Sequence, residues 1–131
     1  MTHLESERVS VPKPAGEIFR FLSDFTNFEN LMPEQVTEWK ASPDQCSFKI
    51  KGLASLGMQI KERIPDSSIV IENDGGPFRF LLRCSILEKD ETSNVQLTLD
   101  ADLNPMMQMM ASRPLTNFLN LLAGRLKEYF S

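Results

Sequence analysis

The chain has 131 residues, of which 41% are hydrophobic and 24% charged, with a formal net charge of −4 and a pI near 5.0. This length suits one domain with one sizeable core, so we expect a single domain over residues 1–131. The composition excludes a disordered or fibrous protein. The acidic balance disfavours nucleic acid as the main partner, because binding to a phosphate backbone requires a dense basic face.

Cysteine usage and the N-terminus both predict a cytoplasmic location. Cys46 and Cys84 lie far apart in the sequence and have no CxxC or Cys/His companion, so the spacing predicts buried, reduced thiols instead of a disulfide or a zinc site. The first ten residues carry no apolar signal-peptide core, and no run approaches the roughly 18 to 20 apolar residues of a membrane span. We expect no metal and no cofactor.

The first third of the chain predicts one strand and two short helices. Residues 2–11 alternate and are followed by prolines, which is typical of a strand that stops there. Residues 15–23 have the apolar spacing of a short helix. Thr26 and Glu29 then fit the capping-box pattern, which predicts a second small helix that runs to about Leu31.

The middle of the chain predicts an antiparallel sheet. After Pro33 the hydrophobic period changes from about 3.6 residues to 2 and stays there for roughly seventy residues. The predicted strands cover residues 36–42, 45–53, 56–64, 68–73, 78–89 and 94–103. Turns this short require antiparallel neighbours. Gly75 and Gly76 are interpreted as a hairpin turn and not as a phosphate-binding loop, because a strand follows them where such a loop needs a helix.

Residues 104–131 predict one long amphipathic helix. Asn104 suits the N-cap and Pro105 the first helical position. Pro114 removes a backbone hydrogen bond and is expected to kink the helix or split it near Arg113. From Leu115 onward the apolar residues recur at helical spacing on a stripe that must face a core. The stripe consists of Leu115, Phe118, Leu119, Leu122, Leu126 and Phe130.

This order of elements resembles the helix-grip superfamily of START domains, polyketide cyclase/dehydrase-like proteins and plant pathogenesis-related lipid carriers. The likeness is carried by Val9-Ser10-Val11-Pro12-Lys13-Pro14 running into residues 17–24, and by Phe28 followed by Leu31-Met32-Pro33. The resemblance implies an α+β helix-grip fold, in which a curved seven-stranded antiparallel sheet wraps around a long C-terminal helix, with two short helices after strand 1. A cavity would lie between sheet and helix. The motif is structural and names no substrate.

Four methionines, Met106, Met107, Met109 and Met110, surround the first turns of the long helix. The resemblance places these turns beside the cavity entrance, so we interpret the flexible side chains as a lining or gate for an apolar ligand. Irregular core filling is one alternative. An exposed patch used in a homodimer is another.

Two carboxylates are candidate polar groups of the cavity. Glu62 shares the phase of the apolar residues in its predicted strand, so strict alternation brings it to the inner face. Glu7 reaches that face from the first strand unless a bulge shifts the register. There each could orient a polar ligand group or act as an acid or base. The alternative is that each lies near a strand end and pairs with an arginine such as Arg8 or Arg83.

The preferred hypothesis is a small cytoplasmic protein that binds a hydrophobic or amphipathic small molecule, such as a lipid, isoprenoid or polyketide-like compound. The predicted cavity residues are Glu7, Phe48, Ile60, Glu62, Phe80, Leu82, Leu97, Leu99, Met107, Met110 and Phe118. A second hypothesis is a cyclase or dehydratase in which Glu62 moves protons. It is weakened because His3, the one histidine, lies at the terminus. A third is a protein-interaction module, related in fold to chaperone-activating members of the superfamily, with a closed, side-chain-filled interior.

Overall fold

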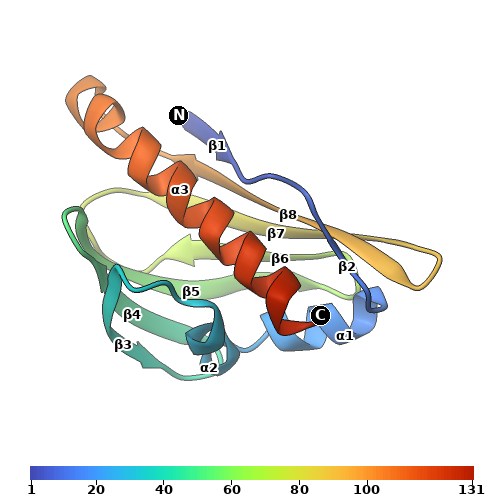
Figure 1. Ribbon diagram of the computed structural model, residues 1–131. Coiled ribbons are helices and arrows are strands. Elements are labelled where there is room, and N and C mark those ends of the chain that lie inside the picture. Colours follow the sequence, from blue (N-terminus) through green and yellow to red (C-terminus); the bar gives the residue numbers. More distant parts are fainter.

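A computed structural model describes residues 1–131 as one sheet, one long helix and a small helical corner (Figure 1). The elements in chain order are β1 (Thr2–Glu5), β2 (Val9–Val11), α1 (Ala15–Leu22), α2 (Phe25–Phe28), the 3-10 helix η1 (Glu29–Leu31), β3 (Val36–Ala41), β4 (Gln45–Ile50), β5 (Ala54–Ile64), β6 (Ser68–Asn73), β7 (Phe80–Lys89), β8 (Thr92–Ala101) and α3 (Pro105–Tyr129). No helix combines the length and the apolar content needed to cross a bilayer.

The strands form a single open sheet in the order β1-β8-β7-β6-β5-β4-β3, and every neighbouring pair is antiparallel. Strand β2 also pairs with β8, so β1 and β2 share one position at the edge of the sheet. The sheet curves around α3, which crosses its inner face diagonally, while α1 and α2 cover the end of the sheet near the C-terminus (Figure 1).

The core lies between the inner face of the sheet and α3. Strand β8 alternates cleanly, with Val95, Leu97 and Leu99 no more than 5% exposed. The predicted stripe of α3 meets this face, where Leu115, Leu119, Leu122 and Leu126 are 1–3% exposed. Burying one such leucine is worth about 1.5–3 kcal/mol. The amphipathic pattern of the helix is therefore what holds it on the sheet.

Helix α3 is continuous over Pro105–Tyr129, so of the two expected outcomes at Pro114, a kink or a split near Arg113, the split is wrong. The side chain of Asn104 caps it by accepting the Met107 N–H at 2.8 Å. Pro114 lies inside the helix, where its missing N–H leaves the Met110 carbonyl without an intrahelical partner. One lost hydrogen bond does not end the helix, because the buried residues on the C-terminal side of Pro114 fix it on the sheet.

The prediction of a single strand over residues 2–11 is wrong, because the strand is broken into β1 and β2. Pairing with β8 changes from Glu5 opposite Thr98 to Val9 opposite Val95, which leaves one extra residue between β1 and β2. Ser6, 4% exposed, lies at the break. Its N–H donates to the Leu97 carbonyl at 2.8 Å, and its hydroxyl accepts the Leu97 N–H at 3.0 Å.

The capping box predicted at Thr26 and Glu29 is also wrong. Asp24 caps α2, since its carboxylate accepts hydrogen bonds from the Thr26 N–H at 2.9 Å and from the Thr26 hydroxyl at 2.6 Å. The helix consequently starts at Phe25, and residues 29–31 continue it as a 3-10 turn. The helical corner itself lies where the sequence predicts it.

The turn at Gly75 and Gly76 is confirmed, with φ angles of +78° and +94°. It folds back so closely that a Cβ on Gly57 would collide with the carbonyl oxygen of Asp74. The Asp74 N–H donates to the Gly57 carbonyl at 2.8 Å, which fixes the two segments together. Only glycine fits at position 57 without displacing this turn.

We therefore expect Gly57→Ala to lower the free energy of unfolding by about 1–3 kcal/mol, measured by urea denaturation. Gly124→Ala is the matched control, because nothing lies within 4 Å of a Cβ at this helical position. That variant should gain up to ~1 kcal/mol from helix propensity. Equal effects of the two substitutions would contradict the close approach at Gly57.

The two cysteines are free and buried, and burial raises the pKa of each thiol to about 12. Both thiols stay protonated near neutral pH, and the thiolate is the reactive form. We expect neither to react with a disulfide reagent such as DTNB at pH 8 in the folded protein, and both to react once urea unfolds it. Rapid modification of the native chain would show that the strands bearing Cys46 and Cys84 open readily.

Candidate functional site

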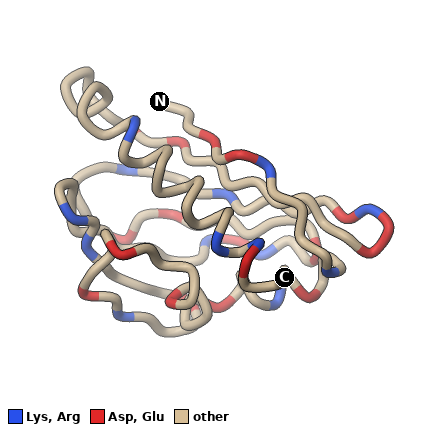
Figure 2. The backbone as a smooth tube through the Cα atoms, viewed as in Figure 1, with Lys and Arg blue, Asp and Glu red and all other residues tan.

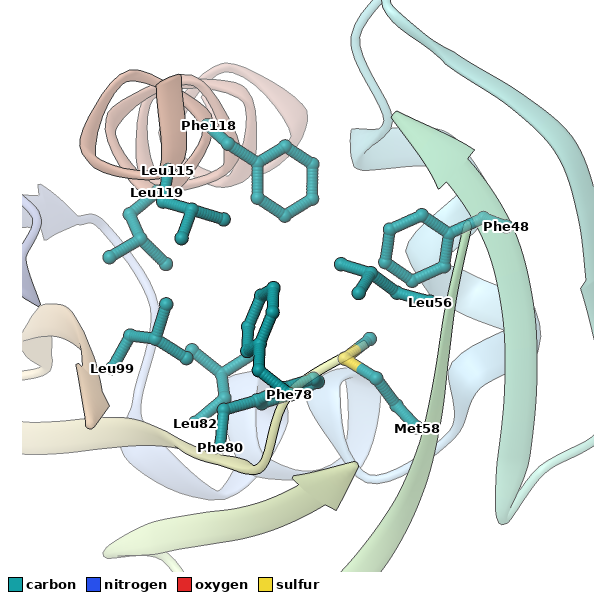
Figure 3. Close-up of a pocket in the computed structure, with 10 residues that line it drawn as sticks. All are labelled: Phe48, Leu56, Met58, Phe78, Phe80, Leu82, Leu99, Leu115, Phe118 and Leu119. Atoms are coloured by element: carbon teal, nitrogen blue, oxygen red, sulfur yellow. The ribbon is translucent and has the colours of Figure 1, made fainter. Parts of the chain in front are cut away.

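An apolar cavity lies between α3 and the sheet (Figure 3). Strands β4, β5, β7 and β8, the segment before β7, and α3 all contribute to its walls. Its lining is formed by Phe48, Leu56, Met58, Phe78, Phe80, Leu82, Leu99, Leu115, Phe118 and Leu119. All ten residues are hydrophobic. The cavity thus presents carbon and one thioether sulfur, and no polar side-chain group.

Strand pairing places these side chains together. Phe48 lies opposite Leu56 in the β4–β5 ladder, and Leu82 lies opposite Leu99 in the β7–β8 ladder. Directly opposed residues in an antiparallel pair point to the same face, so both pairs face α3. The backbone of α3 packs most closely on β1, β2, β8 and η1. Strands β4 and β5 reach the helix through large side chains instead, and the cavity lies in this wider part.

The cavity is narrow. It measures about 320 Å³ when its open mouth is included, but the centre of a water-sized sphere can reach only about 20 Å³ of it. That reachable volume is far below the roughly 300–1,000 Å³ of an ordinary small-molecule pocket. The rings of Phe48 and Phe118 approach to 6.1 Å between centroids and close much of the space. A ligand would have to displace lining side chains, of which Met58 is the most flexible.

Five of the eleven predicted cavity residues line this cavity, namely Phe48, Phe80, Leu82, Leu99 and Phe118. Leu97 is buried in the core outside the lining. Ile60 and Met107 are half-buried and pack against the core from its margin. Met110, Glu7 and Glu62 are exposed. The predicted hydrophobic wall is thus largely present, whereas the two predicted polar groups lie elsewhere.

Glu62 does not face the cavity, because the register of β5 against β6 shifts between Ile60 and Glu62. Ile60 pairs with Ile71, but Glu62 pairs with Val70, and adjacent residues of β6 point to opposite faces. The expected inward orientation of Glu62 is therefore wrong. Arg63 has the alternation phase of the inner face instead, because it pairs with the buried Ile69 of β6. Its guanidinium donates to the Ser23 carbonyl at 2.7 Å and to the Asp44 carboxylate at 2.5 Å.

Glu7 lies in the break between β1 and β2, so its expected place on the inner face is also wrong. Its backbone N–H donates to the side-chain oxygen of Asn120 in α3 at 2.7 Å, while its carboxylate is exposed. The bulge that shifts the register is the one around Ser6. No acid or base lines the cavity, so the site offers no proton-transfer group to a bound molecule.

The prediction missed five lining residues, Leu56, Met58, Phe78, Leu115 and Leu119. Strand pairing identifies the first two, since they oppose Phe48 and Cys46. Phe78 has the alternation phase of Phe80, and their rings lie 5.9 Å apart. The last two belong to the predicted helical stripe, on the same face as Phe118. The signals were present, but the distance between α3 and each strand decides which inward residues border a space.

The methionine-rich start of α3 does not line the cavity. Met106, Met109 and Met110 are 71%, 87% and 69% exposed. Helical spacing puts them on the side of α3 opposite the buried stripe, and Figure 2 shows no charge on these turns before Arg113. Three methionines thus form an exposed apolar surface, which agrees with the alternative of a contact patch better than with a lining.

His3, the one histidine, lies on the outer face of the sheet. Its ring accepts or donates a hydrogen bond at 2.7 Å to the carboxylate of Asp100, which raises the pKa of His3 above its ordinary value. Glu5 adds a second negative charge at 3.9 Å. The His3 side chain is 52% exposed and lies on the face of the sheet opposite the cavity, so it forms a surface ion pair and is not a cavity base.

We expect the single histidine to titrate above pH 6.5 in NMR spectra of the folded protein, and Asp100→Asn to lower that pKa. Because the folded pKa is raised, the small stabilisation from this pair is present below pH ~6.5 and is lost as the pH rises through the folded value. An unchanged pKa in the Asp100→Asn variant would contradict the assigned contact.

Comparison with known proteins supplies matches of fold alone. The sequence matches no protein-family model and no curated protein. Among solved structures, the protein XoxI from Bacillus cereus superposes with a TM-score of 0.78 at 12% identity, over 99% of this chain and 96% of that chain. A START superfamily protein from Mycobacterium smegmatis gives 0.70 at 18% identity, over 97% and 98% of the two chains.

Norcoclaurine synthase from Thalictrum flavum also matches, with a TM-score of 0.75 at 9% identity, over 98% of this chain and 85% of that chain. At identities this low, a shared fold carries no activity with it. The matches do show that the predicted fold is correct. The chain has an open, curved antiparallel sheet around a long C-terminal helix, which is the helix-grip fold.

Proposed function

From the helix-grip fold as premise, we propose that this chain binds a hydrophobic or amphipathic small molecule, such as a lipid, isoprenoid or polyketide-like compound, between the sheet and α3. The observation that carries the proposal is the all-apolar lining of the cavity. Apolar burial contributes about 25 cal/mol per Å² removed from water. A ligand that buries ~200 Å² would gain about 5 kcal/mol before the cost of association.

The proposal includes a cytoplasmic setting, which the two buried free thiols support. It does not include catalysis. A cyclase or dehydratase needs an acid or base beside the substrate. The lining contains no titratable side chain, and Glu62 lies outside it.

A second candidate function is protein interaction, and two observations favour it. The interior is nearly filled by side chains, which is what the interaction hypothesis expects. Met106, Met109 and Met110 also form an exposed apolar surface, and adaptable thioethers suit a protein contact. Self-association into a homodimer through this surface is one form of this candidate.

The two candidates differ in which side chains matter. A neutral fluorescent apolar probe, N-phenyl-1-naphthylamine, should bind the purified protein saturably with a blue-shifted emission. We expect Phe118→Trp or Leu99→Phe to weaken probe binding at least tenfold, because either fills the remaining space. Leu87→Ala is the matched control, since Leu87 is 69% exposed and outside the cavity lining.

The double variant Met106→Ser/Met109→Ser should leave probe binding unchanged under the first candidate. Under the second, it should weaken self-association or partner binding, measured by analytical ultracentrifugation or pull-down. Probe binding that survives both cavity-filling variants, with cooperative unfolding of each variant verified, would exclude the cavity as the site. Absence of any co-purified molecule in native mass spectra, combined with no probe binding, would leave only the interaction candidate.

A further inference from the structure

We infer that the group buried in this cavity is an aromatic hydrocarbon of about one ring, with any polar end of the ligand left at the mouth. This inference rests on the proposed binding function and names its ligand class. Four of the ten lining residues are phenylalanines, Phe48, Phe78, Phe80 and Phe118, and they come from β4, the segment before β7, β7 and α3. Aromatic rings therefore meet the cavity from several sides (Figure 3).

The first argument concerns polarity. The strand segments that carry the lining are paired in the β4–β5 and β7–β8 ladders, so the sheet uses their backbone N–H and carbonyl groups. Every buried side-chain nitrogen and oxygen atom in the protein already has a hydrogen-bond partner, so none is left to bond a ligand. A hydroxyl inside the cavity would lose its hydrogen bonds to water and find none in return. The buried part of the ligand must therefore be hydrocarbon.

The second argument concerns shape. The rings of Phe48 and Phe118 lie 23° from parallel, with centroids 6.1 Å apart, and the ring of Trp39 packs on Phe48 with a centroid distance of 5.5 Å. A flat aromatic ring is only about 3.5 Å thick, the contact distance of carbon atoms, so it needs the smallest displacement of these side chains for the number of carbon atoms that it buries. Thicker saturated groups require a larger displacement, and they gain no stacking contact with the phenylalanines.

The test uses three para-substituted benzenes that differ in how many ends are polar. p-Xylene has none, p-cresol has one and hydroquinone has two, so hydroquinone must bury a hydroxyl in either orientation. Binding is measured from chemical-shift changes of the lining methyl groups of Leu82, Leu99 and Leu115. Each affinity is divided by the octanol–water partition of the compound, because octanol supplies the hydrogen bonds that the cavity lacks.

We expect p-xylene and p-cresol to bind comparably after this correction, and hydroquinone at least tenfold more weakly. Phe118→Leu should strengthen p-xylene binding several-fold, because the smaller side chain enlarges the cavity. Leu126→Ala is the matched control, because Leu126 is 1% exposed on the same helix but outside the lining. It should destabilise the protein without changing the corrected affinities.

Dodecanol, an aliphatic amphiphile, separates failure of this inference from failure of the proposed function. Hydroquinone that binds as well as p-cresol overturns the requirement that the buried part be hydrocarbon, and dodecanol that binds where the three benzenes do not overturns the aromatic assignment. Either result leaves the binding function standing. If none of the four compounds binds either the wild-type protein or the Phe118→Leu variant, both the inference and the proposed function are wrong.

Discussion

The structure depends on one constraint, the mismatch in width between the sheet and the helix that it grips. Seven strand positions at about 4.8 Å spacing make a sheet roughly 29 Å wide. A single helix with its side chains is about 10–12 Å across. Helix α3 must bury its apolar stripe, and it does so against β8, β1 and β2. The remaining inner face must be covered in another way.

Two devices cover the rest of that face. The corner formed by α1, α2 and η1 closes one end of the sheet, where Phe25 and Phe28 are 0% and 2% exposed. On the side of β4 and β5, large side chains span the distance to the helix, and Phe48 meets Phe118 there. A helix that lies to one side of a curved sheet thus leaves a strip that large apolar side chains or a bound molecule must fill. The cavity is narrow because the side chains already fill most of this strip.

How much the sequence predicts follows from the range of each interaction. Alternation in residues 95–101 and helical spacing after Leu115 are local patterns, and both identify the buried face correctly. The bulges at Ser6 and between Ile60 and Glu62 depend on how each strand pairs with its neighbour, and the local sequence pattern does not contain that information. Asp24 and Thr26 are both residue types that cap helices well, so composition alone does not choose between them. Asp24 is the cap because its carboxylate accepts the Thr26 N–H in the folded turn. The wall of the site was therefore predictable, and its polar content was not.

These two bulges also determine what the site can do. Without them, strict alternation would bring Glu7 and Glu62 to the inner face, where an unpaired carboxylate costs several kcal/mol or becomes protonated. Each bulge adds one residue and turns one carboxylate towards water. The first bulge keeps Leu4 and Val9 opposite buried residues of β8, and the second gives Arg63 the phase of the inner face at the margin of the sheet. The interior then has no charge to solvate and no proton to transfer. A cavity of this kind distinguishes molecules by the shape and the hydrocarbon content of the part that enters it, since those are the only properties that its walls can sense.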